Sequence, residues 1–459
     1  MHKIREIKHY PPIHKIFEYY HEEEDIVFLD SSLQNQLGRY SIMGRKPYLK
    51  LVQGEVFTAN GVIQDISFEE YIRIYLREHP DKNETELPIV SGAIGYLTYD
   101  YGRKKERVAT RHPLEVDMPD AVFCFYDNFI VEDHREKRLY TVTNGQTEDA
   151  DILQDKVSLE ICRIYEDQGA DREEITVNDC QKKVNISPNF TKKEYMQAVD
   201  DMISYIIEGD IYIANMTQHL YIESPRKPFE VFRDLRKQNP SPFGGFLNYK
   251  GLQIVCASPE RFLQMHDRHV ETRPIKGTRK RGATPDEDAA MRAELENSKK
   301  DKSELLMIVD LERNDLNRVC VPGTVKVTEM YTVEEYATVF HLISNVAGEL
   351  REDLTVMDLL KSAFPGGSIT GAPKLRAMEI IDELEHSRRN LYTGSIGYFT
   401  LDGGCDFNIV IRTAVCQNGK YYLGVGGGIT YESELEFEYE ETLQKAKAVV
   451  EALCGGGKS

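Results

Sequence analysis

The chain has 459 residues and a formal net charge of −19, with 41% hydrophobic and 29% charged residues. This length allows two or three domains with a large core. The acidic balance makes nucleic acid and anionic membranes poor partners because like charges repel, but it is compatible with a local basic pocket for a small acidic ligand.

The N-terminus and the cysteines indicate where the protein resides. The opening segment, MHKIREIKHYPPIHK, lacks the apolar stretch of a secretory signal, and no later run is long and apolar enough for a membrane helix. The eight cysteines form no C-x-x-C pair, which favours reduced thiols. We therefore expect a cytoplasmic protein without a membrane partner.

The first part of the chain is rich in short β-branched and aromatic runs, such as AVFCFYDNFIVEDH at 121–134, separated by Gly, Asn and Asp. A charged helical pattern follows at 146–173, and 176–190 has the composition of a linker. We predict three regions: an N-terminal strand-rich subdomain over 1–175, a catalytic region over 190–453, and a disordered tail over 454–459.

The second part mixes helices and strands. A helix is predicted to begin after the N-cap Thr191 and to stop at Gly209. We expect further helices at 284–313, 353–362, 373–385 and 437–453, and strands at 252–257, 392–400, 405–416 and 420–425. Because these elements do not alternate as regular βαβ units, an α+β fold is favoured over a doubly wound sheet.

Three glutamates could gather on helix faces. Glu304 lies in the predicted helix at 284–313, and Glu438 and Glu441 share one face of the C-terminal helix, with Lys445 one turn further on. Carboxylates from separate helices, without a His or Cys cluster, suit a hard cation such as Mg²⁺. On spacing alone, a solvated acidic face is the favoured interpretation.

Several other features have two interpretations. The glycine-rich segments at 364–374 and 424–429 could cradle an anion or form tight turns. Arg412, in an apolar strand pattern, needs a carboxylate from the protein or from a ligand. His341, among apolar neighbours, is by itself typical of a core histidine. Lys276, in the basic segment RPIKGTRKRG, could bind an anion, act as a nucleophile or lie in a solvated turn.

Taken together and in order, ten segments resemble the chorismate-utilising enzyme family over residues 190–453. GRYSIMG and SGAIGYLTYDY, in the N-terminal part, are similar to its amino-transferring members. The ten segments are GDIYIANMTQ, NPSPF, SPERF, RPIKGTRKRG, SELLMIVDLERNDLNR, HLISNVAGEL, AFPGGSITGAPKLRAMEIIDELE, YTGSIGYF, FNIVIRTA and GGGI.

The resemblance implies a fold and a site. The fold is one large α+β unit with two central sheets and outer helices, and chorismate is held with Mg²⁺ in its cleft. Glu304, Glu438 and Glu441 match the metal site, and Glu260 matches the general acid that protonates the departing hydroxyl. His341 matches a histidine near the site. The residues that match substrate contacts are Gly277, Ser368, Tyr398, Arg412, Gly426, Gly428 and Lys445.

Two positions indicate the branch of the family. The branch that adds a hydroxyl carries a water-activating lysine where this chain has Ile213, which cannot take a proton from water. Members that make anthranilate usually carry alanine at the position of Lys276, whereas a lysine is typical of many members that make 4-amino-4-deoxychorismate. The resemblance therefore implies the second product from chorismate and ammonia, with anthranilate as the alternative.

In the mechanism that the family implies, Lys276 attacks the ring as an amine. It must be uncharged at that moment, which nearby cations such as Arg273 or Arg279 favour. Ammonia is expected from a separate glutaminase subunit, because the chain has no G-x-C-x-G nucleophile turn. The alternative from another functional class is that the chain is a catalytically silent regulatory relative, which only binds a partner or tryptophan. FLDSS at 28–32 and NPSPF at 239–243 partly match a tryptophan pocket of the family, so the sequence is compatible with a tryptophan site.

Overall fold

The computed structural model describes residues 2–168, 184–335 and 339–455. Its strands are β1 Lys3–Ile7, β2 Ile26–Asp30, β3 Tyr40–Gln53, β4 Phe57–Ala59, β5 Val62–Ile63, β6 Gly92–Leu97, β7 Ala121–Asp133, β8 Arg138–Thr143, β9 Asn185–Pro188, β10 Ile213–Glu223, β11 Phe243–Tyr249, β12 Leu252–Ser258, β13 Arg261–His266, β14 His269–Thr272, β15 Ile275–Lys280, β16 Lys326–Glu335, β17 Val339–Glu349, β18 Gly371–Ala372, β19 Ser395–Thr400, β20 Cys405–Asn408, β21 Thr413–Gln417 and β22 Lys420–Ile429. The helices are α1 Ile13–Tyr20, α2 Phe68–Glu78, α3 Tyr99–Lys105, α4 Ala150–Gln168, α5 Lys192–Glu208, α6 Pro228–Gln238, α7 Pro285–Asn297, α8 Lys299–Asn317, α9 Val356–Ala363, α10 Lys374–Leu384 and α11 Leu435–Cys454, with a 3₁₀ turn η1 at Gly367–Ile369.

The strands join into one antiparallel network that has two halves. From β10 the pairing runs through β22, β21, β12 and β11 to β2 and β3. From β3 it continues through β7, β6, β19, β20 and β13 to β14 and β17, and β17 also pairs with β15 and β16. The α+β fold is confirmed, and the two expected sheets are linked through strands of the N-terminal part.

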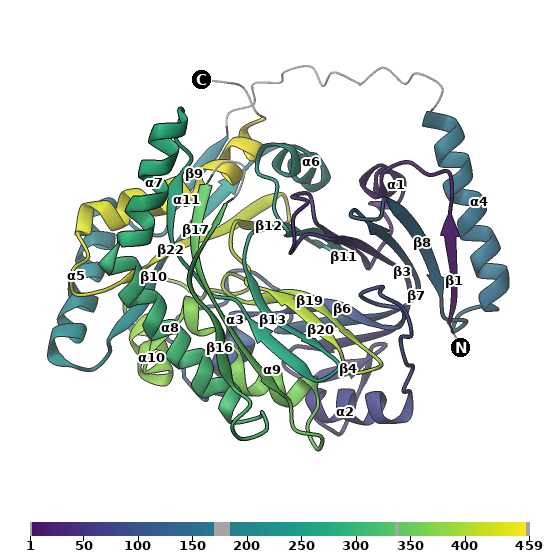
Figure 1. Cartoon of the computed structure of the whole chain (residues 1–459), viewed down its shortest axis with the longest axis horizontal. Helices are drawn as coiled ribbons and strands as arrows, with labels where there is room; N and C mark the ends of the chain where they lie inside the picture. The colour runs from purple at the N-terminus through teal and green to yellow at the C-terminus, as the bar shows by residue number, and fades with distance from the viewer. Residues whose placement is uncertain (1, 169–183, 336–338, 456–459) are drawn as a thin grey trace.

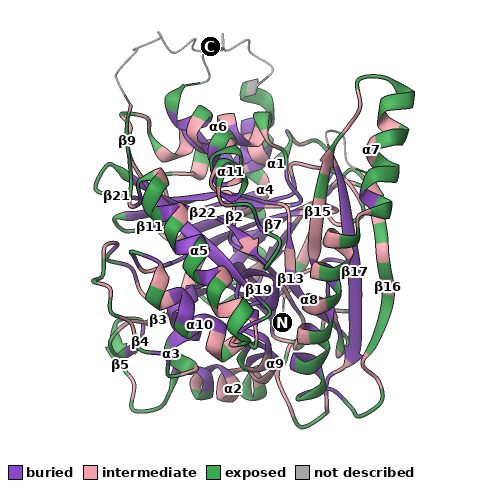
Figure 2. Ribbon diagram, turned by 90° about the vertical axis from the view of Figure 1, so that its left-hand side faces the viewer, coloured by how far each residue is buried: buried purple, intermediate pink, exposed green. Residues whose placement is uncertain are grey.

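The ends of this network come back together. An added Cβ on Gly428 of β22 would lie 3.3 Å from Nζ of Lys276 on β15. Helices cover the outside: α5 and α6 contact α11, which packs on β22, whereas α8 packs on β17, β15 and β16. Figure 1 shows α5, α8, α10 and α11 gathered on one side and α4 beside β1 and β8 on the other. The most exposed helix is α7, which is green along most of its length in Figure 2 and buries only Leu295.

Local chemistry explains where the elements begin and end. Helix α5 begins at the Thr191–Glu194 capping box and ends at Gly209 in the left-handed conformation, as predicted. The single helix predicted over 284–313 is wrong, because the chain breaks at Ser298. The backbone of Ser298 is extended, and its hydroxyl accepts a hydrogen bond from the Asp301 amide, so it caps α8.

Two further predictions need comment. The strand predicted over 405–416 is divided into β20 and β21, because Arg412 has a φ of +51° that no regular strand accommodates. The N-terminal subdomain shares its sheet with the catalytic region through the β2–β11 and β6–β19 pairs. Most of the predicted linker and residues 456–459 of the predicted tail lie outside the described residues.

Candidate active site

The candidate site lies where the two halves of the sheet meet, around the glycines of β22. An added Cβ on Gly428 would lie 3.3 Å from Lys276 Nζ, 3.6 Å from Ile213 Cδ1 and 4.0 Å from Glu304 Oε2. These groups come from β15, β10 and α8. A side chain at residue 428 would crowd the amine and approach the carboxylate, so glycine keeps this position open.

Helix α11 brings its charged face to the next glycine. An added Cβ on Gly427 would lie 2.7 Å from Glu441 Oε2, 3.3 Å from Glu438 Oε2 and 3.5 Å from Lys445 Nζ. Lys445 donates to the Gly426 carbonyl at 2.9 Å and to Glu441 at 2.7 Å. The predicted spacing of the two glutamates on one helical face is thus confirmed, and that face is directed at β22.

Ser368 links the predicted acid to the predicted nucleophile. Its hydroxyl donates a 3.0 Å hydrogen bond to Glu260 Oε1, and its carbonyl accepts a 3.2 Å hydrogen bond from Lys276 Nζ. Ser368 lies in the 3₁₀ turn η1, and Glu260 follows β12 directly. One short turn therefore contacts both groups.

Burial controls the protonation of two neighbouring carboxyl groups. Burial raises the pKa of Glu260, although the charge of Lys276 and the hydrogen bond from Ser368 partly offset this effect. Burial, and then Glu260, raise the pKa of Glu312 on α8 well above its usual range. Glu260 is thereby suited to donate a proton at a pH where exposed carboxyl groups have already lost theirs.

Arg412 is a partly buried cation at the candidate site. Its φ of +51° lies in the left-handed region, and burial lowers the pKa of its guanidinium, with Glu260 opposing that shift. In the part of the chain that the structure describes, no hydrogen bond or ion pair engages this guanidinium. A partly buried arginine with unused donors is well suited to bind a ligand carboxylate.

His341 lies on β17 and is uncharged. Burial, and then the charge of Arg412, lower the pKa of His341 to about 4. Its Nδ1 lies 2.8 Å from the hydroxyl of Thr278 on the paired strand β15. At neutral pH the imidazole therefore brings no positive charge to the site.

The structure gives Gly277 a role in shaping β15. Its φ is +76°, and an added Cβ would lie 2.8 Å from Asp301 Cγ and 2.9 Å from Leu295 Cδ1. The register against β17 shifts between Lys276 and Thr278 at this point. Glycine is thus required for the irregular strand beside Lys276 and for close packing on α7 and α8, whereas its contact with substrate stays a prediction.

The cations near Lys276 are already neutralised. Arg273 contacts Glu329 at 3.1 Å and Glu334 at 2.6 Å. Arg279 contacts Glu294 at 2.7 Å and Asp301 at 3.1 Å. The expectation that these two arginines favour an uncharged Lys276 is therefore corrected, since each is balanced by two carboxylates.

Tyr398 lies elsewhere than expected. It lines a cavity of about 340 Å³ together with Arg261 and Asp406, and burial, followed by the charge of Asp406, raises its pKa. Tyr392 lies at β22 instead, since an added Cβ on Gly424 would lie 2.2 Å from its ring. Tyr392 is thus the tyrosine of LYTGSIGYF that lies beside the glycines of β22, and the sequence does not separate it from Tyr398 because both belong to that segment.

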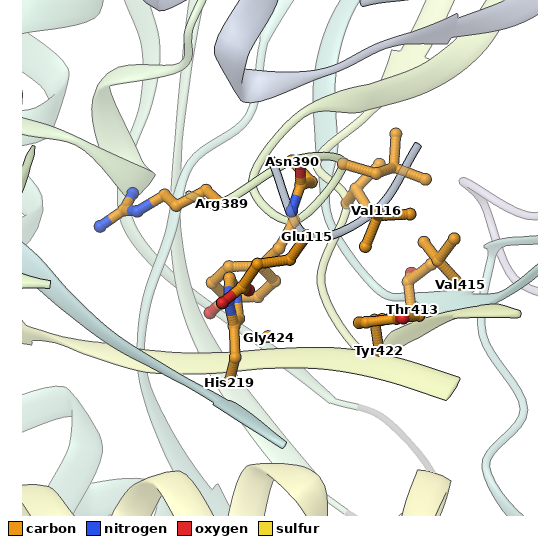
Figure 3. Close-up of a pocket in the computed structure, with 12 residues that line it drawn as sticks. Glu115, Val116, His219, Arg389, Asn390, Thr413, Val415, Tyr422 and Gly424 are labelled. Atoms are coloured by element: carbon orange, nitrogen blue, oxygen red, sulfur yellow. The ribbon is translucent and has the colours of Figure 1, made fainter. Parts of the chain in front are cut away.

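Each of these two tyrosines lines a cavity, Tyr398 the larger one and Tyr392 the smaller one. FLDSS and NPSPF meet at the larger one, where the Ser31 hydroxyl donates to the Pro242 carbonyl at 2.8 Å. The smaller cavity has a volume of about 20 Å³, enough for a single water molecule, and is lined by residues that include His219, Arg389 and Tyr392 (Figure 3). Its size excludes a ring-sized substrate.

The three predicted metal-ligating glutamates face one region without forming a compact cage. In the described ranges, no group of three or more His, Cys, Asp or Glu side chains is arranged to hold a metal ion. Burial raises the pKa of both Glu304 and Glu438, and the charge of Glu441 adds to the shift in each case. The donor set fits a hard cation, which would relieve this crowding of negative charge. Of the described helices, none is both long and apolar enough to cross a bilayer.

Comparison with known proteins yields two kinds of relative. A family model described as chorismate binding enzyme matches residues 27–451. Aminodeoxychorismate synthase component 1 of Bacillus subtilis (strain 168) is 36% identical over 423 residues, which cover 91% of this chain and 89% of that protein. Anthranilate synthase component 1 of Acetivibrio thermocellus is 36% identical over 453 residues, which cover 95% and 92%. The crystal structure of anthranilate synthase component I from Streptococcus pneumoniae TIGR4 has a TM-score of 0.79 at 30% identity, covering 91% of this chain and 93% of that chain. Relatives named for two different products thus match about equally well.

Proposed function

This chain belongs to the chorismate binding enzyme family, and within it we propose that the chain is component 1 of an aminodeoxychorismate synthase. That activity converts chorismate and ammonia to 4-amino-4-deoxychorismate, on the route to p-aminobenzoate and folate. The observation that carries the proposal is the position of the Lys276 amine, between the open Gly428 backbone and Ser368, whose hydroxyl contacts Glu260.

In the proposed reaction Lys276 is the nucleophile and Glu260 donates and recovers the proton. The uncharged amine forms a bond to the ring carbon next to the carboxylate-bearing carbon, while the ring hydroxyl leaves as water with the Glu260 proton. Ammonia then bonds to the carbon that lost the hydroxyl, and the bond to Lys276 breaks as the double bonds shift back. The new ammonium returns a proton to Glu260, so that chorismate and ammonia give the product and one water.

Arg412 and the carboxylate site on α8 and α11 support a dianionic substrate. The unengaged guanidinium of Arg412 suits the enolpyruvyl carboxylate. We propose that Glu304, Glu438 and Glu441 hold Mg²⁺, which when bound neutralises and fixes the ring carboxylate. Lys445, next to Glu441, adds a second cation at the same end of the site.

Formation of anthranilate is the alternative, because relatives with that name are as similar to the chain. Lys276 favours the proposed product, and Ile213 disfavours activation of water. Ammonia is proposed to come from a glutaminase subunit. Incubation with chorismate, MgCl₂ and an ammonium salt, followed by chromatography, tests the proposal: we expect aminodeoxychorismate, whereas anthranilate with equimolar pyruvate would contradict it.

A further inference from the structure

Arg389 is a buried arginine whose donors are all occupied. Its side chain is 1% exposed and forms an ion pair with Glu385 at 2.6 Å. Its two terminal nitrogens also donate to backbone carbonyls, Nη1 to Ile369 at 2.7 Å and Nη2 to Asn215 at 2.6 Å. In Figure 3 its guanidinium points away from the other labelled side chains of the small cavity.

The two carbonyls belong to two neighbouring segments of the candidate site, the turn η1 and strand β10. Ile369 follows Ser368, which contacts Glu260 and Lys276. Asn215 is two residues beyond Ile213 on β10. Backbone contacts also join the two segments: the Asn215 amide donates to the Thr370 carbonyl at 2.8 Å, and β10 pairs with the short strand β18 that follows the turn. Arg389 therefore connects the turn that holds the acid and the amine to the strand that faces the same glycine.

A charge pair alone would not explain an arginine at this position. Lysine would also neutralise Glu385, but its three donors lie on one nitrogen, whereas arginine spreads its donors over three nitrogens that point in different directions. Buried ion pairs can often be replaced by apolar residues without loss of stability. The planar fork of donors is the feature that only arginine provides.

We propose that Arg389 is a positioning residue, which fixes the turn at Ser368 relative to β10 and so aligns Glu260 and Lys276. Its role is to hold the backbone of the turn and the backbone of β10 together, without contact to the substrate. The inference rests on the proposed function only in taking Glu260 and Lys276 as the groups that act on chorismate.

The central experiment is a double-mutant cycle with Arg389→Lys and Ser368→Ala. A misplacement of about 1 Å can reduce a rate by about 10²-fold, so we expect a loss of that order in kcat for Arg389→Lys. The KM for chorismate should change less, because Arg412 is untouched. If Arg389 acts through Ser368, the double variant should be only slightly slower than the slower single variant. If the loss of kcat in the double variant equals the product of the two single losses, the proposal is overturned.

The pH profile supplies a readout that a general loss of stability would not move. The Ser368 hydroxyl lowers the pKa of Glu260. When that hydrogen bond is weakened, the alkaline limb of kcat should move to higher pH, in the same direction for Arg389→Lys and Ser368→Ala. If the alkaline limb of the kcat–pH profile of Arg389→Lys stays at its wild-type pH, the proposal is contradicted.

Two controls separate positioning from folding and from charge. Arg45→Lys makes the same exchange at a buried arginine of β3, which contacts Glu23 and Glu160, and should lower stability without lowering kcat. Should Arg389→Lys fail to fold, the pair Glu385→Gln with Arg389→Met removes both charges. We expect that variant to fold with low kcat, and full kcat would overturn the proposal. The wild-type product tests the proposed function separately, since rates relative to wild type apply to either product.

Discussion

Lys276 and Ile213 face the same backbone position on β22: the lysine Nζ lies 3.3 Å, and the isoleucine Cδ1 3.6 Å, from the point that a Cβ on Gly428 would occupy. Their strands, β15 and β10, lie at opposite ends of the sheet network. The amine and the apolar end of the isoleucine thus border the same opening at Gly428. In the proposed reaction this arrangement favours attack by the amine over attack by water.

Arg412→Met should weaken substrate binding while stabilising the protein. Loss of a hydrogen bond to a charged group costs about 1.5–3 kcal/mol, so we expect the KM for chorismate to rise by about 10-fold to 10²-fold. The thermal midpoint should rise, because the substitution removes a desolvated cation that no described side chain pairs. Steady-state kinetics and calorimetry check both effects, and an unchanged KM would contradict the carboxylate-binding role.

Glu260→Gln should reduce kcat by about 10²-fold or more, the usual contribution of a general acid. It should also alter stability with pH. The folded pKa of Glu260 is raised by burial, so its contribution to stability is present below the unfolded pKa and is lost as pH rises through the folded value. Relative to wild type, the variant should therefore gain stability between about pH 5 and pH 8. If thermal unfolding gives the same difference in midpoint between variant and wild type at pH 5 and at pH 8, this assignment is contradicted.

Mg²⁺ should stabilise the protein through Glu304. At ten times the dissociation constant, a bound ligand adds about 1.4 kcal/mol to the free energy of unfolding. Glu304→Gln should abolish the resulting rise in the thermal midpoint with MgCl₂. Glu440→Gln, on the exposed face of α11 where Glu440 pairs with Lys192, should keep it. An equal rise in both variants would place the cation elsewhere.

The larger cavity should take an aromatic amino acid such as tryptophan. FLDSS and NPSPF meet there, and its volume of about 340 Å³ accommodates a ligand of that size. The chain contains no tryptophan, so all tryptophan-type emission of extensively dialysed protein must come from bound ligand. We expect the emission of added tryptophan to shift on binding, and emission identical to that of free tryptophan would exclude the site.

Features that are local in sequence were predictable. The capping box at Thr191 defines α5, and the i, i+3 spacing of Glu438 and Glu441 places both on one face of α11. The break at Ser298 was missed, because a serine within a helical pattern does not reveal whether it caps a new helix. Likewise, the pattern of FNIVIRTA does not show that Arg412 takes a positive φ.

Features that depend on distant partners were not predictable. The carboxylates that neutralise Arg273 and Arg279 come from α7, α8 and β16. The carbonyl partners of Arg389 lie 20 and 174 residues away in sequence. Glu312 has no local pattern that separates it from an exposed acid on a helix. Such contacts follow from the packing of the sheet halves, which the sequence alone does not specify.

The rate of aminodeoxychorismate formation by Lys276→Ala tests the account most directly. Lys280→Ala, an exposed lysine on the same strand, is the matched control. We expect Lys280→Ala to resemble wild type and Lys276→Ala to lose at least about 10²-fold, since the covalent route is then closed; a shift of the residual product toward anthranilate would show that the lysine selects the branch. A wild-type rate of aminodeoxychorismate formation by Lys276→Ala would contradict the account.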